Sequence, residues 1–151
     1  MKSLVWLRND LRMDDNPALK HACLNSDEVH CLYLYQPDQM KLHNVASCKI
    51  EFIIENLKDL ESSLSKINVP LTVITSKCFD DCPNLIIDVI NKRSIKKVYW
   101  NNQFGFDEQR RDSAVKDVLD RNNIYNESFD DQVIYPPGTI RTMISEYLLM
   151  V

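Results

Sequence analysis

Two polar segments and one loop histidine contain the residues of this chain whose types and spacing could do chemistry. Residues 8–15 interleave arginines with aspartates, and residues 101–108 end in the adjacent carboxylates Asp107 and Glu108. A guanidinium group binds anions, and one carboxylate can accept two parallel N–H donors from the edge of a heterocycle. Both segments are therefore candidates for holding a ligand.

Each candidate also has a purely structural interpretation. Arg8 or Arg12 could hold a ligand anion, but such charges more often pair with carboxylates and fix the loop between a strand and a helix, which is the role we expect. Asp107 and Glu108 could simply favour the N-terminus of a helix electrostatically. His43 precedes a long helical pattern, and a lone loop histidine is commonly a surface residue.

Several other chemistries are excluded by what the sequence lacks. Its two glycines, Gly105 and Gly138, form neither a G-x-G-x-x-G fingerprint nor a phosphate-binding Walker loop, and there is no G-x-S-x-G elbow. The five cysteines form no C-x-x-C pair, so we expect no metal site. Cys23 and Cys31 are expected to be small buried hydrophobes, and this cysteine usage fits a reducing cytoplasm.

The composition is that of one soluble globular domain. The chain has 151 residues, of which 44% are hydrophobic and 26% charged, and its net charge is -4. Such a balance does not favour direct binding of nucleic acid, which normally needs a basic face. We expect Arg110 and Arg111 to lie on a solvated helix face, and we expect neither a signal peptide nor a membrane span.

Hydrophobic runs and periodicity predict alternating strands and helices. Continuous apolar or β-branched runs predict strands at residues 4–7, 29–35, 71–75 and 97–100, with a short one at 124–129. Helical spacing predicts helices at 17–24, with Asn16 as N-cap, at 46–67, from Pro83 onwards, and at 107–121.

This order predicts an α/β fold: a Rossmann-like, doubly wound, five-stranded parallel sheet with helices on both faces. Ligands in such folds bind beyond the carboxyl ends of the strands, where the strand order reverses. With a strand order of 3-2-1-4-5, that point lies between the first and fourth strands. Residues 8–15 and 101–108 would then meet there.

The run from Trp6 to Leu19 resembles the opening signature of the photolyase/cryptochrome family. It matches Trp, an aliphatic residue, Arg, any residue, Asp-Leu-Arg and, after two variable positions, Asp-Asn, any residue and Ala-Leu. Three further stretches agree with the family in order and spacing: Leu34-Tyr35 with Pro37, residues 99–112, and residues 129–139. The resemblance is closest to bacterial cyclobutane pyrimidine dimer photolyases that use a folate antenna.

The resemblance implies a light-harvesting domain that binds a cofactor. Residues 1–135 would be the α/β antenna domain of a deoxyribodipyrimidine photolyase, and residues 136–151 the start of a truncated interdomain linker. The antenna would be methenyltetrahydrofolate, with a deazaflavin as the alternative. FAD would bind only in a helical C-terminal domain, which we do not expect within these 151 residues.

The same resemblance assigns cofactor binding to His43, Asp107 and Glu108. Asp107 occupies a position where folate-type relatives have Asn, so this sequence replaces an amide donor with a charge. The helical flavin domain would be a partner in cis or in trans, and no repair activity is expected from this chain alone.

Two other functions remain open on the residues. The first is a nucleotide or small-molecule binding module with the same type of sheet, although the chain lacks the usual glycine-bearing loop. The second is a truncated remnant that only docks onto a flavin-binding partner; an exposed apolar patch would favour that role.

Overall fold

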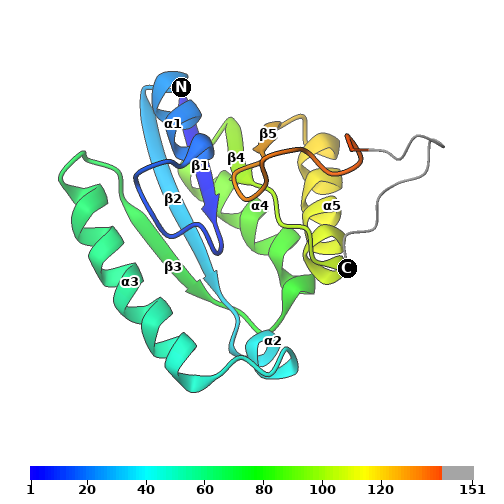
Figure 1. The fold of residues 1–151 in the computed structure, drawn as a ribbon. Helices are drawn as coiled ribbons and strands as arrows, with labels where there is room; N and C mark the ends of the chain where they lie inside the picture. Colours follow the sequence, from blue (N-terminus) through cyan, green and yellow to red (C-terminus); the bar gives the residue numbers. More distant parts are fainter. Residues whose placement is uncertain (141–151) are drawn as a thin grey trace.

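A parallel sheet forms the centre of the molecule. The computed structural model describes residues 1–140 and contains five strands in the order β3-β2-β1-β4-β5, all parallel (Figure 1). The strands are β1 (Lys2–Leu7), β2 (Glu28–Tyr35), β3 (Leu71–Thr75), β4 (Lys97–Asn101) and β5 (Tyr125–Phe129). This is the predicted fold class and strand order. The order reverses at β1, which pairs with β2 on one side and β4 on the other.

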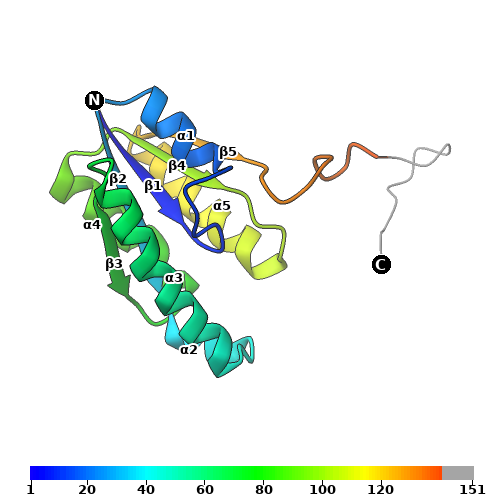
Figure 2. The same ribbon diagram turned by 60° about the vertical axis from the view of Figure 1, so that its left-hand side comes forward.

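Helices cover both faces of the sheet (Figures 1 and 2). They are α1 (Pro17–Leu24), α2 (Pro37–Leu42), α3 (Ser47–Ser65), α4 (Cys82–Arg93) and α5 (Phe106–Arg121), with the 3-10 turn η1 (Phe79–Asp81) before α4. Helices α1 and α3 contribute to the core on one face, and α4 and α5 to the core on the other.

Strand β1 shows why the buried strands have continuous apolar sequences. Successive side chains point to opposite faces of a sheet, so Val5 and Leu7 enter the core beneath α1 and α3, whereas Leu4 and Trp6 enter the core beneath α4 and α5. All four are at most 1% exposed. Trp6 packs edge-on against Trp100 of β4, with 6.2 Å between their ring centroids.

Two helix predictions differ from the structure in detail. Only the C-terminal half of the apolar stripe of α3 is deeply buried, since Leu57, Leu60 and Leu64 lie in the core whereas Ile54 is 40% exposed. Helix α2 was not predicted, because Pro37, interpreted as the end of a strand, is also the first residue of this six-residue helix.

The cysteine predictions were partly wrong. Cys31 lies in the core, but Cys23 is exposed because it is on the outer side of α1. Within residues 1–140 there is no cluster of three or more metal-ligating side chains. No helix in the described part of the chain is long and apolar enough to cross a membrane.

Candidate functional site

A cavity lies at the carboxyl ends of β1, β2 and β4, where the strand order reverses. We call it the strand-end cavity. Its polar lining comes from the residues after β1 and β2, from α2 and α3, from the segment after β4 and from α5: Arg8, Asn9, Gln36, Gln39, His43, Lys49, Gln103, Glu108 and Arg111. The cavity encloses about 140 Å³. Pockets that enclose a whole drug-sized ligand have about 300–1,000 Å³, so this cavity can receive only part of such a ligand.

Arg8 forms one wall of the cavity and is almost completely buried. Its guanidinium pairs with Asp112 of α5, at 3.3 Å, and donates to the main-chain carbonyl of Asn101. It also lies 4.3 Å from the centre of the Trp6 ring, a favourable cation–π contact. Burial lowers the pKa of Arg8 to about 10, which still leaves the group charged at neutral pH.

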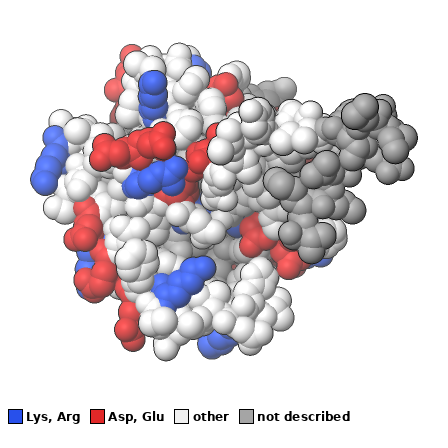
Figure 3. Space-filling view, in the orientation of Figure 1, with Lys and Arg blue, Asp and Glu red and all other residues white. Residues whose placement is uncertain are grey.

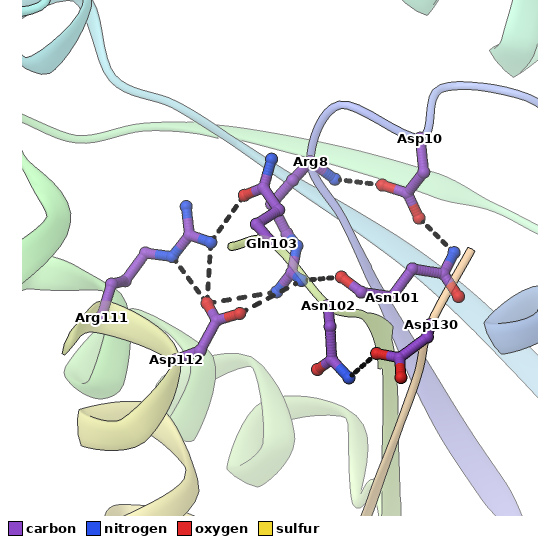
Figure 4. A network of polar contacts seen from close by, with 8 residues as sticks. All are labelled: Arg8, Asp10, Asn101, Asn102, Gln103, Arg111, Asp112 and Asp130. Carbon is purple, nitrogen blue, oxygen red and sulfur yellow. Dashed lines mark hydrogen bonds and ion pairs between the residues drawn. The ribbon is translucent and has the colours of Figure 1, made fainter. Parts of the chain in front are cut away.

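A buried amide and carboxylate network fixes the loop after β1 (Figure 4). Asp10 accepts from the main-chain N–H of Arg8, at 2.7 Å, and from the Asn101 amide, at 2.6 Å. Asn101 also donates to Asn16, whose oxygen accepts from the N–H of Leu19 and so caps α1 as predicted. This network explains the interleaved polar residues of 8–15 as structural.

Arg12 has a similar structural role at the other end of that loop. Its guanidinium pairs with Asp131 at 2.8 Å, and Asn102 donates to the neighbouring Asp130 at 2.7 Å. The expected structural role of the two arginines is therefore confirmed. Their partners are distant in sequence, however, and lie on α5 for Arg8 and just after β5 for Arg12.

Arg111 is buried, contrary to the expectation of a solvated helix face; Arg110 is exposed as expected. Arg111 donates to Asp112 and, at 2.8 Å, to the side-chain oxygen of Gln103 (Figure 4). Its guanidinium also lies 4.6 Å from the centre of the Phe79 ring. These contacts remove Arg111 from solvent and make it part of the cavity wall.

The structure brings the three predicted cofactor-binding residues close together but in different roles. His43, the C-cap of α2, and Glu108, in the first turn of α5, both line the strand-end cavity. Asp107 is not among the residues that line the cavity. It instead pairs with His43, whose Nε2 lies 3.3 Å from Asp107 Oδ2.

Glu108 bends back over the start of its own helix. A Cβ atom at Gly105, the N-cap of α5, would overlap the Glu108 carboxylate. The missing side chain at Gly105 therefore leaves the space that the carboxylate occupies.

Sequence reasoning missed several polar cavity residues that the fold supplies, among them Gln36, Gln39 and Arg111. Gln36 follows β2 directly, Gln39 lies on the unpredicted α2, and Arg111 was assigned to the surface. Gln36 could have been found from its position, since it follows the carboxyl end of a predicted strand at the sheet edge where ligands bind. No sequence signal marks Gln39.

Comparison with known proteins gives a consistent result. The DNA photolyase family model matches residues 3–150. The chain is 32% identical to the deoxyribodipyrimidine photo-lyase of Vibrio cholerae over 144 residues, which cover 95% of this chain and 31% of that protein. It is 36% identical to the Escherichia coli protein of the same description over 140 residues, covering 92% of this chain and 29% of that protein.

Solved structures agree on the fold. An archaeal photolyase from Sulfolobus tokodaii superimposes with a TM-score of 0.78 at 22% identity, covering 94% of this chain and 32% of that chain. A class III photolyase from Agrobacterium tumefaciens gives a TM-score of 0.75 at 24% identity, covering 96% of this chain and 29% of that chain. The chain thus spans about a third of the length of the relatives that it matches.

Proposed function

This chain belongs to the DNA photolyase family and corresponds to the family's α/β domain, and we propose that it binds an antenna chromophore in the strand-end cavity and harvests light. One observation carries the proposal: His43 and Glu108, far apart in sequence, line the same cavity at the point where the strand order reverses. This is the position at which doubly wound sheets bind ligands.

We propose methenyltetrahydrofolate as the chromophore. Glu108 offers a carboxylate that can accept the N–H and the adjacent amino group on the edge of a pterin ring. The small cavity suits a ring system, while the rest of a folate would lie outside it. A deazaflavin is the alternative, but the corresponding edge of its ring carries carbonyl oxygens, which the carboxylate of Glu108 would repel.

One solved structure of the same fold is described as having a light-harvesting cofactor. The structure of the Sulfolobus tokodaii photolyase is described as containing two FAD molecules and as implying a novel light-harvesting cofactor. That description applies to the archaeal protein. For this chain it is consistent with the proposal that a chromophore is bound, and it does not identify the chromophore.

In this proposal the chain supplies binding and orientation, and the chromophore supplies the absorption of light. Arg8 and Arg111 hold the cavity wall rigid through Asp112, His43 lies at the rim, and Glu108 orients the ring. Excitation energy would pass to FAD in a helical domain, in cis or in trans, where pyrimidine dimers are repaired. Residues 1–135 would form the antenna domain and residues 136–151 the start of the linker.

The proposal assigns no direct contact with nucleic acid to this domain. Acidic and basic side chains are interspersed on the face shown in Figure 3, and the net charge of the chain is -4. A surface that binds the phosphate backbone would instead concentrate lysine and arginine.

The proposal is tested by parallel fluorescence titrations of the purified chain with methenyltetrahydrofolate, a deazaflavin and ATP. Saturable binding of methenyltetrahydrofolate, and weaker or no binding of the other two, would support it. Tight binding of ATP alone would assign the chain to the nucleotide-binding modules. Light-driven dimer repair by this chain with added FAD would contradict its assignment as an antenna domain without activity of its own.

A further inference from the structure

Gln103 is a buried glutamine on the wall of the strand-end cavity. Its side chain is 9% exposed and follows β4 by two residues. A buried amide has one acceptor and one donor group, and each needs a partner because leaving either unpaired is costly. The partners of Gln103 therefore indicate what the cavity can recognise.

The side-chain oxygen of Gln103 has a partner that fixes the orientation of the amide. It accepts a hydrogen bond of 2.8 Å from Arg111. A guanidinium has donors only, so the oxygen must face Arg111 and the nitrogen must point away from it. Within residues 1–140, Gln103 Nε2 donates no hydrogen bond, and Gln103 lines the strand-end cavity, so this donor is free for a ligand.

Gln36 also lines the cavity, and its amide is paired in the opposite way to that of Gln103. Its nitrogen donates to the main-chain carbonyl of Cys78 and to Cys82 Sγ, the latter at 3.3 Å. Its oxygen is consequently the group left for a ligand. The groups on the cavity wall thus include an oriented amide donor, from Gln103, and two acceptors, from Gln36 and Glu108.

We propose that Gln103 is a specificity-determining residue of this cavity, which donates to a carbonyl oxygen of the bound ring, and that Arg111 is the residue that positions it. This inference rests on the proposed function and deepens it by naming the residue that recognises the carbonyl of the ring. The ring is a planar lactam that carries a carbonyl beside N–H and amino donors, the edge shared by pterins and guanine. An isoalloxazine or deazaflavin edge, with carbonyls on both sides of one N–H, matches this donor but not the two acceptors.

The test compares four variants in titrations with methenyltetrahydrofolate, guanosine and riboflavin. Gln103→Glu replaces the donor with an acceptor, and Gln103→Met removes it at nearly constant volume. Arg111→Lys keeps the charge beside Asp112 but loses the planar fork that orients the amide. Gln109→Glu is the matched control, because Gln109 is an exposed glutamine on α5 that bonds only to the Phe104 carbonyl.

We expect both Gln103 variants to weaken lactam binding at least about tenfold, as loss of one well-placed buried hydrogen bond implies, and the control to change it less than about twofold. Arg111→Lys should weaken binding of the two lactams, methenyltetrahydrofolate and guanosine. It should also reduce the ratio of their affinities to the affinity for riboflavin. The ¹⁵N–¹H signal of the Gln103 amide in the wild type gives a readout that does not depend on how the variants fold. It should shift when the ligand saturates.

Two of the three outcomes separate the role of Gln103 from the proposed function. If methenyltetrahydrofolate binds but the Gln103 variants and the amide signal are unaffected, the role of Gln103 is overturned and the proposed function stands. If guanosine binds but methenyltetrahydrofolate does not, and the Gln103 variants bind guanosine more weakly than the wild type, the role of Gln103 stands and the antenna function is overturned. If no lactam binds to the wild type, both are overturned.

Discussion

His43 Nε2 lies 3.3 Å from Asp107 Oδ2, and this contact joins the end of α2 to the first turn of α5 beside the strand-end cavity. The imidazole also contacts Gln39, at 3.0 Å, and packs edge-on against Phe79. Because Asp107 itself does not line the cavity, in the proposed function its carboxylate would act on a ligand only by holding His43 in place. The carboxylate of Asp107 therefore does not line the cavity itself.

The first prediction follows from this contact. Asp107→Asn should weaken chromophore binding by less than about fivefold, because a partly exposed contact between a histidine and a carboxylate contributes at most about 1 kcal/mol. His43→Ala should have a larger effect. In a double-mutant cycle measured by titration, Asp107→Asn should have no further effect once His43 is alanine. Independent, additive effects would mean that Asp107 contacts the ligand directly.

The second prediction concerns the buried charges of the cavity wall. Asp112 is 12% exposed and is the carboxylate partner of both Arg8 and Arg111. Asp112→Asn should lower the free energy of unfolding by about 3 kcal/mol, because it leaves two buried cations without a counter-charge. Urea unfolding measures the change, and Asp117→Asn on the exposed side of α5 is the control. Equal stability of the two variants would show that the arginines do not depend on Asp112.

The third prediction concerns Gly105. Its substitution by alanine would push the Glu108 carboxylate aside, so Gly105→Ala should reduce chromophore affinity much as Glu108→Ala does. The loss of stability should be small, about 1 kcal/mol, because glycine is the better N-cap residue. Titration and thermal unfolding of the same sample separate the two effects. Unchanged affinity would show that the carboxylate has room to bind from another position.

The fourth prediction is a loss of stability in alkaline solution. Burial raises the pKa of Cys31 and Tyr33 to about 12 and that of Cys82 to about 11, each above its ordinary value. The unfolded chain therefore releases these protons at lower pH than the folded chain, so the free energy of unfolding falls as pH rises above about 9. Each group contributes a slope of at most about 1.4 kcal/mol per pH unit.

Arg8 has the opposite effect, because burial lowers its pKa to about 10, but its contribution begins only near that pH. Urea unfolding from about pH 8 to about pH 10 therefore isolates the buried acids. Cys31→Ala should make the decline shallower, whereas substitution of the exposed Cys48 should not. An identical slope for wild type and Cys31→Ala would contradict the prediction.

Much of the fold could be predicted because the buried strands leave a simple pattern. Both faces of β1 and β2 are covered, so their sequences are continuous apolar runs, and the helices between them keep the spacing of one buried stripe. Helix α2 escaped prediction because six residues are too few to show a period.

The candidate site could be predicted only in part. His43 and Glu108 were identified through a family resemblance, and the fold brings both to one cavity. Arg111 was misassigned because a charged residue in a charged helix normally faces water. Its burial depends on contacts with Asp112, Gln103 and Phe79, and the last two lie outside its own helix. Such tertiary partners leave no trace in local sequence.

The central claim is tested most directly by titrating methenyltetrahydrofolate into the wild type, His43→Ala and Glu108→Ala, followed by near-ultraviolet absorbance and fluorescence. Glu61→Ala, an exposed glutamate of α3, is the matched control. We predict saturable binding that both cavity variants weaken about tenfold or more and that the control leaves unchanged. Absence of saturable binding to the wild type, or binding that neither cavity variant weakens, would contradict the assignment of an antenna site to the strand-end cavity.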